Sequence, residues 1–78
     1  MSPFILEVPA HAEARLRLRK ITRNKIRKCI IHGNVTENGR RGRTVQRYKF
    51  GSRILEIVTI RRMGGYLLVT CYWKGKTP

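Results

Sequence analysis

The chain has 78 residues, of which 18 are Lys or Arg and only 4 are Asp or Glu, so its formal net charge is +14. This length suits a single domain, 1–78, and a hydrophobic content of 41% argues against intrinsic disorder. Cations in such excess repel one another in a folded protein unless an external polyanion neutralises them. We therefore expect a polyanionic partner, with RNA the first candidate and an acidic protein the second.

The sequence also predicts a cytoplasmic protein that does not bind membranes. No apolar run approaches membrane-spanning length, and the N-terminal residues lack the basic start and long apolar stretch of a signal peptide. A basic amphipathic helix with bulky apolar anchors is also missing. Cys29 and Cys71 are expected to be buried free thiols in a reducing compartment rather than a disulfide.

The first residues predict a short apolar segment followed by a helix. Phe4 to Val8 is apolar and ends at Pro9, so it is either an edge strand or an extended lead-in. Residues 10–19 predict a helix in which Glu13 and Arg17 are spaced to form an i,i+4 ion pair. The opposite face, which should meet the rest of the protein, mixes four apolar residues with three polar ones: Ala12, Ala14, Leu16 and Leu18 with His11, Arg15 and Arg19.

A second helix is predicted from Thr22, a favourable N-cap residue, to about His32. Gly33 is expected to end this helix in the left-handed conformation that glycine adopts readily. The inward stripe of the helix consists of one cysteine and two isoleucines, namely Ile26, Cys29 and Ile30.

From residue 44 onward the pattern changes to a period of two, which is typical of strands. Three segments rich in β-branched and aromatic residues, 44–50, 54–60 and 66–73, are joined by short turns, which predicts an antiparallel meander. Residues 34–37 are a candidate for one further short strand. The predicted fold class is therefore α+β, with two N-terminal helices packed on one face of a three- to four-stranded antiparallel sheet in the order α-α-β-β-β.

The first helix carries a pattern that resembles a known group of domains. Residues 11–22 fit H-A-x-x-R-x-x-x-R-x-I-S/T, the opening of a family of small basic bacterial domains of unknown function. The similarity continues through 55–58 and into 68–73, and so covers nearly the whole chain. The resemblance implies a fold similar to RelE-, ParE- and BrnT-type toxins, within the barnase-like and colicin-like ribonucleases. Members of that group commonly cleave RNA without a metal and are neutralised by an antitoxin.

Metal-free RNA cleavage needs a proton acceptor, a proton donor and cations around the phosphate. His11, Arg15 and Arg19 lie at i, i+4 and i+8, so a helix would align one imidazole with two guanidiniums. The alternative is that these side chains hydrogen-bond to the sheet and only brace the helix. Glu56, the only acid in the predicted meander, is either a general base or the ion-pair partner of Arg15 or Arg19.

Other residues are candidates for nucleic-acid binding. Cations next to an aromatic ring suit a single-stranded backbone with a stacked base. Each candidate has a structural alternative, since a strand tyrosine is often half-buried core and an arginine-rich loop can serve only solubility. The candidates are Arg40, Arg41 and Arg43 in the loop region, Arg47, Tyr48 and Lys49 in the first strand of the meander, and Thr70 and Tyr72 in the last.

The sequence contains no motif for a metal or cofactor. There is no Cys-x-x-Cys pair, no Asp, no P-loop and no dinucleotide fingerprint, so we expect neither a metal site nor a small-molecule cofactor. The leading hypothesis is a metal-independent endoribonuclease of toxin–antitoxin type, acting on free or ribosome-bound RNA. The alternatives are a non-catalytic nucleic-acid-binding module, or a basic domain that docks an acidic antitoxin or regulatory protein.

Overall fold

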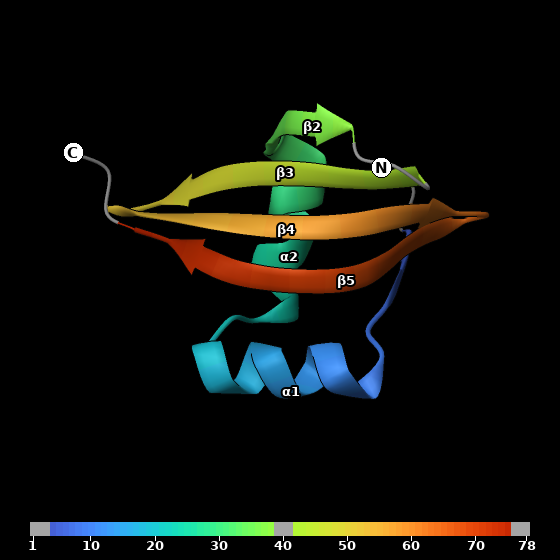
Figure 1. Ribbon diagram of the computed structural model, residues 1–78, viewed down its shortest axis with the longest axis horizontal. Helices are drawn as coiled ribbons and strands as arrows, with labels where there is room; N and C mark the ends of the chain where they lie inside the picture. Colours follow the sequence, from blue (N-terminus) through green and yellow to red (C-terminus); the bar gives the residue numbers. More distant parts are fainter. Residues whose placement is uncertain (1–3, 39–41, 76–78) are drawn as a thin grey trace.

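The computed structural model describes residues 4–38 and 42–75, which form two helices and a five-stranded sheet (Figure 1). The strands lie in the order β1-β5-β4-β3-β2. The elements along the chain are β1 (Ile5–Glu7), α1 (Ala10–Arg19), α2 (Arg23–His32), β2 (Asn34–Asn38), β3 (Arg43–Phe50), β4 (Arg53–Arg62) and β5 (Gly65–Lys74).

The prediction of a three- to four-stranded, purely antiparallel sheet is wrong. The sheet has five strands and is mixed, because β1 runs parallel to β5 while the other neighbours are antiparallel. β1 is too short to show a period of two, and its partner lies at the other end of the chain. Glycine at position 65 permits this pairing, because a Cβ atom there would overlap the Ile5 carbonyl oxygen.

Both helices contribute to one core on the same side of the sheet. The helix α1 lies along β5, and α2 packs across β3 and β4. Within the described ranges no helix covers the opposite side of the strands, which we call the open face; Figure 1 looks onto it, with α2 passing behind the strands. The buried core residues are Leu6, Ala12, Leu16, Ile21, Ile26, Cys29, Ile30, Leu55, Ile57, Leu68 and Cys71.

The helix α1 has the predicted bounds but a narrower buried face than predicted. Ala12 and Leu16 are buried, whereas Ala14 is exposed and Leu18 is 79% exposed. The buried face is narrow because α1 lies along β5, where only a thin stripe of the helix contacts the core. The helix ends at Lys20, whose φ of 55° lies in the left-handed region.

The helix α2 has the predicted bounds, but the glycine that follows it has a different conformation from the one expected. The Thr22 hydroxyl accepts a hydrogen bond from the Lys25 backbone N–H at 3.2 Å, which confirms the N-cap. The expectation of a left-handed Gly33 is wrong, since its φ is −69° and its ψ is 153°. Glycine is needed there for space: a Cβ atom would overlap the Cys29 carbonyl oxygen where the chain turns directly from α2 into β2.

Candidate nucleic-acid interface

Arg15 and Arg19, which were predicted to align with His11 along one side of α1, both contact the sheet. Arg15 Nη1 donates to the Thr70 hydroxyl at 3.1 Å, and Arg19 Nη1 donates to the Cys71 carbonyl oxygen at 2.6 Å. The Trp73 indole N–H in turn donates to the Arg19 carbonyl oxygen at 2.9 Å. β1 pairs only with residues 65–67 of β5, so these contacts lie along the part of the β5 edge that β1 leaves uncovered. Both arginine side chains therefore hold α1 against β5.

The third member of the row, His11, is exposed in the first turn of α1. Its imidazole makes no hydrogen bond or ion pair with any residue that the structure describes. Thr70, a predicted phosphate contact, instead accepts the hydrogen bond from Arg15. The geometry thus supports the bracing interpretation for Arg15 and Arg19, and no acidic or basic side chain among the described residues forms a hydrogen bond or ion pair with His11.

Glu56 lies at the centre of β4 on the open face, yet its side chain is only 4% exposed. Its Oε1 accepts a hydrogen bond from Arg47 Nε and lies 4.0 Å from Lys74 Nζ. The prediction that Glu56 pairs with Arg15 or Arg19 is therefore wrong. The physical reason is strand alternation: Leu55 and Ile57 point into the core, so Glu56 must point away from the helices.

The strand register places Glu56 in a row of polar side chains across the open face. Arg47 on β3 lies directly opposite Glu56, and Tyr72 on β5 lies opposite Glu56 on the other side. Two lysines flank this row: Lys49 pairs with Ile54, which also pairs with Lys74. We call Arg47, Lys49, Tyr72 and Lys74 the basic end of the open face.

The side chains of the basic end are accessible and close together. Those of Arg47 and Lys74 are each 43% exposed, and Lys49 is exposed. Lys74 Nζ lies 6.0 Å from the centre of the half-buried Tyr72 ring. A sheet surface with cations beside an aromatic ring can contact phosphates and a stacked base together.

The remaining predicted binding residues lie elsewhere. Tyr48 points to the helix side, where its ring packs 5.0 Å from that of Phe50, so the core interpretation is favoured over base stacking. Arg43 is exposed at the opposite end of the open face, across from Ile60. Arg40 and Arg41 lie outside the described residues. Lys74 was not among the predicted binding residues, although its position two residues after Tyr72 in a strand places both on one face.

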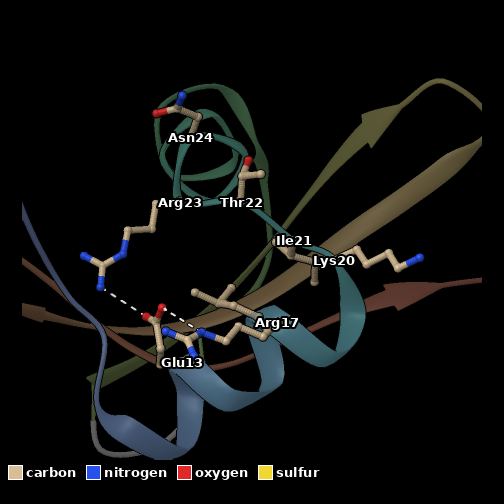
Figure 2. Close-up of a pocket in the computed structure, with 8 residues that line it drawn as sticks. Glu13, Arg17, Lys20, Ile21, Thr22, Arg23 and Asn24 are labelled. Carbon is tan, nitrogen blue, oxygen red and sulfur yellow. Dashed lines mark hydrogen bonds and ion pairs between the residues drawn. The ribbon is translucent and has the colours of Figure 1, made fainter.

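A second basic surface lies between the two helices (Figure 2). The predicted ion pair between Glu13 and Arg17 is confirmed there, with Glu13 Oε1 lying 3.8 Å from Arg17 Nε. Glu13 Oε2 also lies 3.1 Å from Arg23 Nη2 of α2. Figure 2 shows both guanidiniums pointing to this one carboxylate. The Glu13 carboxylate neutralises part of the positive charge of the pocket between the helices. This surface is therefore less suited to binding a phosphate than the basic end.

Comparison with known proteins does not extend these assignments. No protein-family model, curated protein or solved structure matches the chain. The resemblance to toxin-like domains therefore stays a prediction from the motifs. Within 4–38 and 42–75, no helix is long and apolar enough to cross a membrane, and no three His, Cys, Asp or Glu side chains are grouped to hold a metal ion.

Both cysteines are buried and free. Burial, together with the nearby Glu56 carboxylate, raises the pKa of the Cys29 thiol to about 12. Burial also raises the pKa of Cys71, although Arg19 and Arg15 oppose this shift. Because the thiolate is the reactive form, these two residues behave as small apolar core groups.

Proposed function

We propose that the protein binds single-stranded RNA through the basic end of the open face. The observation that carries this proposal is the arrangement of Tyr72 beside Lys74 and in one cross-strand row with Arg47, on a sheet face that no described helix covers. Cations can follow the phosphates while the aromatic ring stacks on a base.

The charges at the basic end favour an anionic ligand. Arg47, Lys49 and Lys74 contribute three positive charges and Glu56 removes one, so the surface keeps an excess of two. The whole chain adds a field from its net charge of +14, which should accelerate association with any nucleic acid. The motif resemblance favours RNA over DNA, and the buried free thiols suit a reducing cytoplasm.

RNA cleavage of the toxin type is a second candidate, favoured by one observation. The Glu56 carboxylate lies in the same cross-strand row as Arg47 and Tyr72 and accepts a hydrogen bond from Arg47. If an RNA phosphate took the place of this carboxylate as the partner of Arg47, Glu56 would be free to act as the general base. Binding without cleavage is the better-supported function, because this carboxylate is nearly inaccessible and already contacts two cations. His11, Arg15 and Arg19 are weaker candidates for catalysis, because both arginines are hydrogen-bonded to β5.

One titration series tests both candidates. A short fluorescently labelled oligouridylate is titrated with the protein in EDTA at several salt concentrations, and the same RNA is then analysed by denaturing gel. The variant Lys49→Ala should weaken binding and reduce the salt slope by about 0.7, the contribution of one phosphate on a single strand. Lys28→Ala is the matched control, because it removes one exposed cation of α2, away from the open face.

The outcomes separate the proposals. Equal weakening by Lys49→Ala and Lys28→Ala would show that binding depends on total charge, which would overturn the assignment to the basic end. Loss of affinity in Tyr72→Ala with the fold retained would support base stacking. RNA fragments made by the parent and absent with Glu56→Gln would establish the cleavage candidate, and intact RNA would exclude it.

A further inference from the structure

Beyond the basic end, the open face is aliphatic. Val58 and Ile60 of β4 alternate with core residues and so point away from the helices, and Ile60 lies opposite Leu67 of β5. Val45 of β3 is the cross-strand neighbour of Val58. We call Val45, Val58, Ile60 and Leu67 the aliphatic strip.

The strip is unusual for a sheet surface in contact with water. An antiparallel sheet with one solvated face normally alternates apolar and polar side chains, whereas β4 carries apolar residues on both faces. Val58, Ile60 and Leu67 are only half-buried, and no described helix or strand packs over them. A contiguous apolar patch rimmed by charges is typical of a protein-binding surface.

Cations border the strip at both of its ends. Arg43 lies opposite Ile60, and Arg62 follows two residues later on the same face, opposite Gly65. The other end of the strip meets the basic end, where Arg47 is the nearest cation in β3. An occupant therefore needs an apolar centre and negative charge toward both ends.

These requirements distinguish the classes of occupant. A second copy of this chain would bring two bodies of net charge +14 together, so charge repulsion opposes it. RNA has the negative charge but no aliphatic groups that could fill the strip. A polypeptide segment with a stripe of aliphatic side chains and flanking carboxylates satisfies both requirements.

We propose that the aliphatic strip docks an acidic amphipathic segment of a partner protein. The distance along β3 from Arg43 to Lys49 is about 20 Å at the usual rise of a strand. A helix of about 16 residues spans a little more than this length. The aliphatic residues of the strip are distinct from the RNA contacts, whereas one acidic end of the docked segment would approach Arg47 and Lys49 of the basic end. The proposal does not depend on RNA binding.

A designed peptide provides the probe. It has about 16 residues, with Leu at helical a and d spacing and Glu on both flanks, and its control is a shuffled peptide of identical composition without the apolar stripe. Fluorescence anisotropy should give a dissociation constant about tenfold lower for the striped peptide. In the protein, Val58→Thr combined with Ile60→Thr should weaken its binding at least about fivefold, while Val35→Thr, an exposed valine of β2, should not.

Each alternative outcome would overturn the proposal. Equal affinity for striped and shuffled peptides would show attraction by charge alone. Dimerisation of the parent in sedimentation experiments, lost in the double variant, would assign the strip to a second copy. If the double variant weakened RNA binding as strongly as peptide binding, RNA would be the occupant. A thermal melt of each variant shows that it is folded, so loss of peptide binding can be assigned to the surface.

Discussion

The Arg19 guanidinium donates a 2.6 Å hydrogen bond to the carbonyl oxygen of Cys71, 52 positions away along the chain. This contact places an arginine from the predicted catalytic row in the interface between α1 and β5. It satisfies a backbone acceptor on the edge of β5 that β1 leaves uncovered, opposite the edge that pairs with β4. The contact therefore changes the expected effect of mutating this residue from catalytic to structural.

Replacing Arg19 by Ala should lower the free energy of unfolding by about 2 kcal/mol, because a charge-assisted hydrogen bond is lost and its acceptor is left without a partner. Urea denaturation measures the change. Arg17→Ala is the control: its side chain is 82% exposed in an ion pair, so about 0.5 kcal/mol or less is expected. A stable Arg19→Ala protein that no longer bound or cut RNA would contradict the structural role.

Replacing Glu56 by Gln should strengthen RNA binding by about threefold to fivefold, because an interaction of up to about 1 kcal/mol between an anion and partly exposed cations is removed. The amide oxygen still accepts a hydrogen bond from Arg47, so the arginine keeps its position. Anisotropy with the labelled RNA gives the affinity. Glu7→Gln removes the same charge from β1 and should have a smaller effect. Weaker binding by Glu56→Gln would argue against the basic end.

Thr59 is fully buried, and its hydroxyl oxygen has no hydrogen-bond partner among the described residues. Thr59→Val keeps the shape and removes the uncompensated polar group, so stability should rise by about 1 kcal/mol. Thr44→Val, at the cross-strand partner, is half-buried and should change stability less. A less stable Thr59→Val protein in urea denaturation would show that the hydroxyl contributes a favourable contact.

Gly65→Ala should destabilise the protein by about 2 kcal/mol, because the added methyl group overlaps the Ile5 carbonyl and forces β1 away from β5. Hydrogen exchange of the Ile5 amide, which donates to the Gly64 carbonyl at 3.0 Å, should also accelerate. Gly75→Ala is the control, since nothing lies within 4 Å of the Cβ position there. Unchanged exchange at Ile5 would refute the parallel pairing.

The raised pKa of Cys29 makes stability depend on alkaline pH. The thiol ionises near 9.0 in the unfolded chain and near 12 in the folded protein, so above pH 9 the folded state holds the extra proton. The free energy of unfolding should therefore fall as pH rises from 9 to 12, with this thiol contributing about 1.4 kcal/mol per pH unit. Cys29→Ala should show a flatter dependence in the same urea titrations. Identical slopes would indicate that the thiol is not desolvated.

The elements were largely predictable because they depend on neighbouring residues. Helical spacing located α1, the Thr22 hydroxyl marked the start of α2, and the period of two located the three long strands. The candidate site was only partly predictable. Arg47, Lys49 and Tyr72 were identified from their residue types, but nothing local indicated that they lie around Glu56.

The amino-acid sequence by itself determined the charge imbalance, the bounds of the helices and the alternation of the strands, since each is set by composition or by contacts over a few positions. Only the tertiary structure decided that β1 pairs with β5, that Arg15 and Arg19 contact β5, and that Glu56 faces away from both helices. These relationships depend on strand order and register, which bring together residues more than 50 positions apart in the case of the two arginines.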